Sequence, residues 1–281
     1  MRFARSVIRN IYEILYKALL LGSALKKLDP DTEIILSLTT FPSRGFCIFW
    51  AILSLKRQEI RPSIIYVTLF PAEYNVRSLR RLTSVLKFIG VTVLYADRNY
   101  KAMKKYYPLK TESLETTSFF AVFDDDVLYA KGVIKSLRGD NTKWKVLISG
   151  CRGKIVRFKN SEEEFSDYVS WLEIKEEKIG RDCFVTGVGG VMYTKSVIDL
   201  LRNQIITNGI DGEQFYTGDD ILIWKLAYKN HINIRCVGET LYFDQKLFRK
   251  NSGLYLNNVN NGGNDVLMNV KLKTDAISRE K

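Results

Sequence analysis

Short apolar runs alternate with amphipathic stretches over the first half of the chain. Four runs have the length and the β-branched or aromatic content of strands, and two stretches have helical spacing. The predicted strands are Ile34–Leu38, Ile64–Phe70, Val91–Tyr95 and Phe119–Phe123, and the predicted helices are Cys47–Lys56 and Asn75–Phe88. The strand runs lack polar alternation, which indicates strands buried on both faces. The sequence therefore predicts an α/β fold with a mainly parallel sheet flanked by helices.

The second half of the chain is less regular. Residues 154–181 are rich in charge and predict a surface excursion, for which a helix is one expectation. Apolar and glycine-rich sequence returns at Val185–Tyr193, where the residues that flank the glycines favour strand over helix. Asp219–Tyr228 has helical spacing again. Asparagine and glycine dominate from Asn257 onward, a composition typical of loops.

The chain begins with a basic amphipathic segment. Phe3–Lys27 predicts a helix, and Asp29–Pro30 is expected to end it. The apolar stripe consists of Ile8, Ile11, Leu15 and Leu19, with basic residues between them. This helix either packs on the rest of the chain or lies on an anionic membrane. We expect residues 1–30 to form this helix and residues 31–281 to form the main domain. With no secretory pattern, the expected location is cytoplasmic.

Composition limits the chemistry. The 281 residues carry a formal net charge of +12, which indicates an anionic partner. The single histidine, His231, excludes histidine-rich zinc sites, so a divalent metal would need oxygen ligands, as Mg²⁺ and Mn²⁺ prefer. The four cysteines form no CxxC pair and indicate reduced structural thiols.

Two acidic motifs carry the strongest chemical signal. The run Phe119–Phe123 leads straight into Asp124–Asp126, and functional groups collect at the carboxyl ends of such strands. Three adjacent carboxylates repel one another, and a divalent cation relieves that repulsion. The structural alternative is an Asp-rich turn that caps a helix. Asp219–Asp220 opens an apolar helical run, where it serves either as a helix cap or as a general base.

Two further clusters each allow more than one interpretation. The block Gly187–Gly190 indicates either a backbone that passes close to a ligand or a simple bend. Lys101, Lys104 and Lys105 lie among tyrosines. They are consistent with a solvated helix face, a diphosphate contact or a nucleic-acid patch.

Four blocks together resemble a family of bacterial GT-A-type glycosyltransferases that assemble capsular and lipopolysaccharide sugars. The blocks are Leu38–Arg44, the strand ending in Asp124–Asp126, Thr186–Tyr193 and Gly218–Trp224. Supporting matches are Lys104–Lys105, Tyr168 with Trp171, and Asn264–Asp265, so the resemblance spans residues 34–265 in the expected order. Two departures leave the carboxylates untouched. Tyr106–Tyr107 replaces an expected aliphatic pair, and Leu222 separates Ile221 from Ile223 where tryptophan is expected directly.

The resemblance implies a GT-A-like Rossmann-type fold and a metal-dependent hexosyltransferase. An inverting mechanism fits the two acidic motifs best, and a retaining mechanism is the alternative. It implies a nucleotide-diphosphate sugar donor, with a UDP-sugar favoured, and a glycan or lipid-linked acceptor. A lipid-linked acceptor would place the protein peripherally on the cytoplasmic face of the inner membrane.

The resemblance also assigns roles to residues of this chain. The donor nucleotide is expected near Thr39, Thr40, Arg44, Lys104, Lys105, Asp124 and Asp125, with Asp124 on the ribose. Mn²⁺ or Mg²⁺ is expected on Asp126, with Asp124 as a second ligand. The donor sugar and acceptor are expected to border Trp171, Thr186, Gly187, Gly189 and Gly190. Asp219 or Asp220 is expected beside the acceptor hydroxyl. Asp220 is the expected general base, with Asp219 as the runner-up, because Asp219 directly follows Gly218 and is the better candidate for the helix cap.

Two other classes of protein share part of this pattern. A haloacid-dehalogenase-like phosphohydrolase also has a strand that ends in aspartates. Its motif has threonine or valine two residues after the second catalytic aspartate, whereas this chain has Leu128 at that distance from Asp126. A basic nucleic-acid-binding protein would explain the net charge, but the acidic motifs would repel a phosphate backbone. We therefore expect an enzyme with no nucleic-acid partner.

Overall fold

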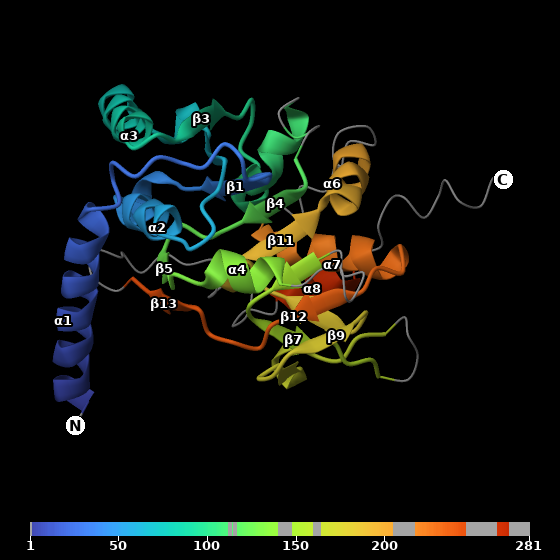
Figure 1. Cartoon of the computed structure of the whole chain (residues 1–281). Coiled ribbons are helices and arrows are strands. Elements are labelled where there is room, and N and C mark those ends of the chain that lie inside the picture. Colours follow the sequence, from blue (N-terminus) through green and yellow to red (C-terminus); the bar gives the residue numbers. More distant parts are fainter. Residues whose placement is uncertain are drawn as a thin grey trace.

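A mixed eight-stranded sheet forms the centre of the molecule (Figure 1). The computed structural model describes residues 2–111, 114, 117–139, 148–159, 164–204, 217–245 and 263–269. The strand order is β3 (Thr92–Tyr95), β2 (Ile64–Leu69), β1 (Ile34–Thr39), β4 (Phe119–Val122), β11 (Val191–Thr194), β6 (Ile148–Gly150), β12 (Ile234–Cys236), β9 (Lys178–Gly180). Strands β3, β2, β1 and β4 pair in parallel, as do β6 and β12. The predicted mainly parallel sheet is confirmed.

Helices cover both faces of this sheet. They are α1 (Arg2–Leu21), α2 (Cys47–Lys56), α3 (Val76–Phe88), α4 (Val133–Arg138), α6 (Lys195–Arg202), α7 (Asp219–Lys229) and α8 (Gly263–Asn269). Alternate residues of β1 point to opposite faces, so Leu36 and Leu38 pack with α2, α3 and α4, whereas Ile35 packs with α6 and α7. The sheet is therefore buried on both sides, as its unbroken apolar strands predict.

Smaller sheets and 3-10 helices complete the described chain. Strand β10 (Cys183–Val185) pairs with β7 (Gly153–Ile155) and β7 with β8 (Leu172–Glu173), while β13 (Tyr242–Asp244) pairs with β5 (Val127–Tyr129). The 3-10 helices are η1 (Pro42–Arg44), η2 (Pro71–Glu73), η3 (Lys101–Lys110), η5 (Tyr168–Ser170) and η6 (Gly187–Gly189).

Most predicted elements are confirmed to within a residue or two, and two predictions are wrong. The helix expected within residues 154–181 is absent from the described part of that segment, which forms β7, η5, β8 and β9 instead. The loop expected from Asn257 falls partly outside the described residues, and Gly263 begins helix α8. Leu267 and Met268 of α8 are buried in the core, so tertiary packing overrides the loop-like composition there.

Helix α1 ends earlier than expected and packs by an unexpected face. It stops at Leu21, where Ser23 N–H donates to Leu20 O at 2.8 Å and tightens the last turn. Against α2 it buries Leu20 and the ion pair between Lys17 and Glu13, whose Nζ and Oε1 atoms lie 2.7 Å apart.

The predicted apolar stripe of α1 faces outward. Ile11, Leu15 and Leu19 are 50%, 61% and 54% exposed, so the helix packs on the rest of the chain, as expected, but through another side. No described helix is both long enough and apolar enough to cross a membrane.

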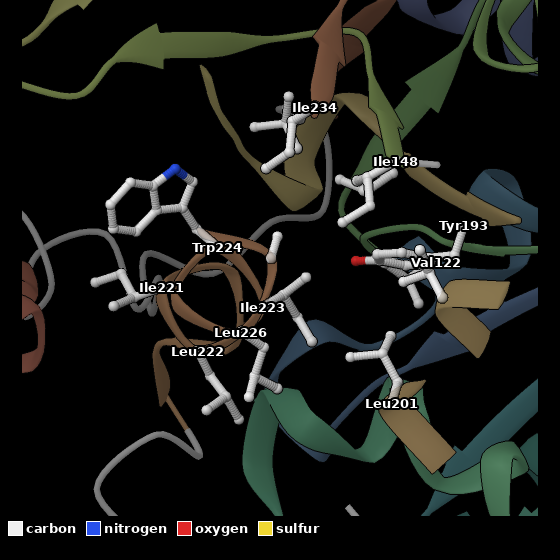
Figure 2. Packing of buried hydrophobic residues seen from close by; sticks show 14 of the residues in the cluster. Val122, Ile148, Tyr193, Leu201, Ile221, Leu222, Ile223, Trp224, Leu226 and Ile234 are labelled. Carbon is white, nitrogen blue, oxygen red and sulfur yellow. The ribbon is translucent and has the colours of Figure 1, made fainter. Parts of the chain in front are cut away.

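Helix α7 is apolar on nearly all sides, which is typical of a helix buried in a core. Ile221 and Trp224 belong to the same buried cluster as Ile148 of β6 and Ile234 of β12 (Figure 2). This packing carries the first turn of α7, and with it Asp219 and Asp220, into the interior. The predicted helix Asp219–Tyr228 is thereby confirmed, one residue shorter than α7.

Candidate active site

The ends of β1 and β4 bring the first acidic motif against the Thr39–Arg44 segment. The two strands are parallel neighbours, with Ser37 opposite Val122, so the residues that follow them lie together. Thr40 Oγ1 donates to Asp125 Oδ2 at 2.5 Å. The Thr39 hydroxyl donates instead to the Thr68 carbonyl at 2.8 Å, within the sheet.

Arg44 is the basic partner of this motif. It ends η1, directly beyond β1, and is 8% exposed. Its Nη1 pairs with Asp126 Oδ2, and its Nε lies 3.8 Å from Asp125 Oδ1. Burial raises the pKa of Asp125 to about 7, although Arg44 opposes the shift. The structure therefore brings Thr40, Arg44 and the acidic motif together as predicted.

Lys105 joins the two acidic motifs. Its Nζ lies 2.9 Å from Asp124 Oδ1 and 3.0 Å from Asp219 Oδ2, and its side chain is 5% exposed. Burial by itself would lower the pKa of Lys105, but Asp124, Asp219 and Asp220 outweigh burial and raise it well above its ordinary value. The ammonium group therefore stays charged between the donor side and the acceptor side of the predicted site.

Lys104 points elsewhere. It is 2% exposed, and its Nζ lies 2.6 Å from Glu73 Oε2, whose other oxygen accepts from Asn99 at 2.8 Å. The reading of the lysine cluster as a solvated face is wrong for both Lys104 and Lys105, because a 3-10 segment turns both inward. Glu73 gave no signal in the sequence that would have linked it to the site.

The second acidic motif opens α7 beside the glycine block. Asp219 was expected to cap this helix, but Gly218 is the N-cap residue and the Asp219 carboxylate pairs with Lys105. Both carboxylate oxygens of Asp220 accept from the Gly187 N–H at 3.1 Å. Burial and, next, Asp219 raise the pKa of Asp220 to about 8.

The glycine block passes through a space that side chains would fill. A Cβ atom at Gly187 would lie 3.1 Å from Lys105 Nζ and 3.3 Å from Asp220 Oδ1. At Gly190, where φ is +83°, a Cβ atom would lie 2.4 Å from the Phe123 ring, directly before the first acidic motif. Gly189 is similarly close to the Arg152 backbone, at 3.1 Å. These contacts show that the block packs closely against other parts of the chain, and its approach to a ligand stays a prediction.

Two predicted residues are farther from the carboxylates. Trp171 is 3% exposed and donates its indole N–H to the Ser166 carbonyl at 3.0 Å. It also packs on Phe184 of β10, the strand that leads into the glycine block. Thr186 follows that strand, and its hydroxyl is buried without a hydrogen-bond partner among the described residues. The binding roles of Trp171 and Thr186 stay predictions.

Two residues that the sequence did not indicate hold the first acidic motif. Tyr129 of β5 donates its hydroxyl to the Asp124 carbonyl at 3.1 Å, and the same oxygen accepts from the Asp124 N–H at 2.8 Å. Gln245 is fully buried, donates its backbone N–H to the Asp126 carbonyl at 3.1 Å and donates its amide to the Cys47 carbonyl at 2.9 Å. No local pattern marks either residue, because each acts through a fold contact.

The predicted metal ligands fit a metal site in which the protein supplies only some of the ligands and the substrate supplies others. The described part of the chain holds no three His, Cys, Asp or Glu side chains arranged to bind a metal alone. Mg²⁺ commonly uses one or two carboxylates and takes its other ligands from water and phosphate oxygens. Asp124 and Asp126 supply such oxygens, and the carboxylates of the two acidic motifs outnumber the two buried cations beside them, Arg44 and Lys105. That excess negative charge fits an additional cation.

The departure at Tyr106 has a structural consequence. Tyr106 and Tyr193 are buried, and their hydroxyl oxygens lie 2.8 Å apart. Tyr193 and Asp220 both line a small, otherwise apolar cavity, with Ile223 and Trp224 on its wall. The phenol that replaces an aliphatic side chain therefore has a polar partner, which offsets the cost of burying its hydroxyl.

Comparison with known proteins identifies the fold. No family model and no curated protein matches this chain. The chain is similar to the crystal structure of S. aureus TarS 1-349 in complex with UDP-GlcNAc, with 13% sequence identity and a TM-score of 0.50, over 79% of this chain and 60% of that chain. The complex with UDP gives 14% identity and a TM-score of 0.49, over 74% and 59% of the two chains.

A third structure of S. aureus TarS 1-349 gives 14% identity and a TM-score of 0.48, over 75% of this chain and 60% of that chain. This chain thus spans about 60% of the length of the structures that it matches. At such identity the likeness shows the fold alone, and the narrower resemblance to capsular and lipopolysaccharide enzymes stays a prediction. The chain shares its fold, an α/β fold of the GT-A-like class that the sequence predicts, with the S. aureus TarS structure in complex with UDP-GlcNAc.

Proposed function

We propose that this protein is a glycosyltransferase that moves a sugar, a hexose by the sequence resemblance, from a nucleotide-diphosphate donor to an acceptor hydroxyl. One observation carries the proposal: Lys105 holds Asp124 of one acidic motif and Asp219 of the other within 3.0 Å of the same ammonium group. A donor at the first motif and an acceptor at the second would therefore meet at one point.

The donor is proposed to lie at the carboxyl ends of β1 and β4, near Thr40, Arg44 and Asp124–Asp126. A UDP-sugar is favoured, because the fold is shared with a protein crystallised with UDP and with UDP-GlcNAc. A diphosphate needs compensating positive charge, and the two buried cations here are already outnumbered by carboxylates. Mn²⁺ or Mg²⁺ held by Asp126 and Asp124 would neutralise charge on the leaving diphosphate.

The acceptor is proposed to be a hydroxyl of a glycan or a lipid-linked sugar, placed beside Asp220. The attacking hydroxyl must lose its proton, and a carboxylate within hydrogen-bond reach can take it. Asp220 suits this role because its partner is the Gly187 amide, whereas Asp219 is engaged by Lys105. One base on the acceptor side, with a separate donor motif, fits a single displacement that inverts the anomeric centre.

Asp126→Ala is expected to abolish transfer and to remove the thermal stabilisation that a nucleoside diphosphate and Mn²⁺ give the wild type. The physical reason is the loss of a carboxylate that binds the metal. The measurement is a thermal-shift screen of nucleotides and nucleotide sugars, each with Mn²⁺ and with chelator, followed by an assay of sugar release. The matched control is Asp182→Ala, a surface carboxylate paired with Lys178 at 3.2 Å.

Three outcomes would count against this assignment. Undiminished Mn²⁺-dependent transfer by the Asp126 variant would remove the metal role. Release of free phosphate from phosphomonoesters, without any response to nucleotide sugars, would favour a phosphohydrolase. Tight binding of DNA or RNA at physiological salt would favour a nucleic-acid protein.

We also propose that α1 attaches the protein to the anionic cytoplasmic face of the inner membrane. The outward side of this helix is apolar, and its exposed large side chains are Ile11, Tyr12, Ile14, Leu15, Leu19 and Leu21. Arg2, Arg5 and Arg9 lie in the same helix, and Lys26 and Lys27 are exposed just beyond it. An apolar face with basic residues around it suits the interface of an anionic bilayer.

The double variant Leu15→Asp with Leu19→Asp is expected to bind anionic liposomes at least roughly tenfold more weakly, because two carboxylates would enter the apolar layer. Cosedimentation with phosphatidylserine-containing and neutral liposomes measures this. Val76→Asp is the matched control, since Val76 is 84% exposed on another helix. If the intact protein ignores anionic liposomes at physiological salt, the membrane proposal is wrong.

A further inference from the structure

We propose that Arg44 is a built-in counter-ion that occupies Asp126 in the donor-free protein and releases it when metal and donor bind. This inference rests on the proposed function, because it concerns the carboxylate assigned to the metal. It adds a property that neither the sequence nor the fold assigns, namely direct competition between an arginine of this chain and the metal for one carboxylate.

The first line of support is the position of Arg44. Its guanidinium pairs with Asp126 and approaches Asp125, with 9% of the side chain exposed. Its Nε is buried without a hydrogen-bond partner among the described residues. A buried donor without a partner is costly, so the present position does not satisfy this side chain fully. Arg44 is thus aimed into the acidic motif with hydrogen-bonding capacity to spare.

The second line of support is charge. A metal ion on Asp126 would lie next to the guanidinium, and two cations at that distance in a buried site repel each other. The guanidinium must therefore leave Asp126 before the metal binds there. The Phe41 ring, whose centroid lies 5.2 Å from Arg44 Cζ, and Asp125 remain as its neighbours.

The displaced guanidinium has a natural new partner. Its planar set of N–H donors matches phosphate oxygens, which it binds in pairs. The donor diphosphate brings such oxygens to the same end of the sheet. Metal binding without donor then breaks the ion pair between Arg44 and Asp126 and leaves Arg44 with no new partner. When metal and donor bind together, the diphosphate becomes that partner. Metal and nucleotide should therefore bind cooperatively, and each should raise the affinity of the other by the same factor.

Arg44→Gln tests this competition in the full chain without any turnover. Calorimetric titration with MnCl₂ in the absence of nucleotide is expected to show Mn²⁺ bound at least roughly tenfold more tightly by the variant than by wild type, because a charge-assisted pair no longer competes. With UDP present, the gain in Mn²⁺ affinity should be several-fold smaller in the variant. Arg81→Gln is the matched control, since it removes an exposed arginine that also lies over an aromatic ring, that of Phe46 at 5.6 Å.

Each outcome decides the matter. If folded Arg44→Gln binds donor-free Mn²⁺ no more tightly than wild type, or not detectably, the competition is refuted. If wild type never responds to UDP but Arg44→Gln still binds Mn²⁺ more tightly, the competition stands and the proposed function fails. Should Arg44→Gln not fold, Arg44→Lys replaces it, because a shorter, single-point cation should also yield Asp126 more easily. Mn²⁺ affinity equal to or below that of wild type in that variant overturns the proposal.

Discussion

Asp220→Asn is expected to lower turnover by roughly 10²–10⁴-fold while donor affinity stays almost unchanged. The amide keeps the shape of the carboxylate, and its oxygen can still accept from the Gly187 N–H, which lies 3.1 Å from both oxygens of Asp220. It cannot accept a proton from the acceptor hydroxyl. Steady-state kinetics with the donor and acceptor found by the screen, together with donor binding by calorimetry, measures the two effects separately.

The pH dependence supplies a second readout for Asp220. Burial raises its pKa to about 8, with Asp219 adding to the shift and Lys105 opposing it. A base must be deprotonated, so kcat/KM of wild type should rise with pH until about 8 and then level off. Between about pH 4 and pH 8 the folded state keeps a proton that the unfolded state loses, so this group lowers stability as pH rises. Asp220→Asn should remove both trends.

Asp219→Asn is the companion variant that decides between the two carboxylates. Normal transfer by Asp220→Asn, with loss of transfer in Asp219→Asn, would reverse their roles. Full turnover in both variants would make the pair structural, and the base would then lie elsewhere.

Lys105→Met is expected to lower the free energy of unfolding by about 3–5 kcal/mol, because breaking a buried ion pair leaves uncompensated charge. The side chain of Lys105 is 5% exposed and pairs with Asp124 and Asp219, so its removal strands two carboxylates. Urea denaturation followed by circular dichroism measures the change. Activity should fall as well, since the same cation joins the donor and acceptor sides of the proposed site.

Two further variants make the Lys105 result specific. Lys110→Met removes a lysine from the same 3-10 segment, but its side chain is 37% exposed and 4.0 Å from Asp97, so a loss of at most about 1 kcal/mol is expected. Adding Asp219→Asn to Lys105→Met should recover part of the lost stability, because one stranded charge disappears. Strictly additive losses in this double-mutant cycle would contradict the ion cluster.

The sequence predicts the local elements of this fold well, because their signals are local. Cys47–Lys56 forms a helix with the predicted bounds, and Asn75 caps the next helix through its side chain, which accepts from Ser78 N–H at 2.8 Å. The positions of the two acidic motifs were also predictable, because Asp124–Asp126 follows a buried strand and Asp219–Asp220 begins an apolar helix. Two features were sufficient to predict the fold class: the strands are apolar on both faces, and strands alternate with helices along the chain.

Contacts between distant segments could not be predicted in this way. The sequence shows Lys104 and Lys105 as equivalent neighbours, whereas the 3-10 segment turns one toward Glu73 and the other toward the acidic motifs. The apolar stripe of α1 was visible, but not which side of the helix docks. There the buried pair between Glu13 and Lys17 lets a polar face pack inward, since each charge has its partner.

Gln245 bears on how the site is completed during synthesis. Its amide lies 3.5 Å from the carbonyl of Asp125, a residue 120 positions earlier in the chain. At roughly 5–20 residues per second, a ribosome needs roughly 6–24 s to add that stretch. For that interval the nascent acidic motif lacks the backbone bond that Gln245 donates to Asp126. The protein therefore acquires the final geometry of its carboxylates late in translation, well after the strand that carries them has been made.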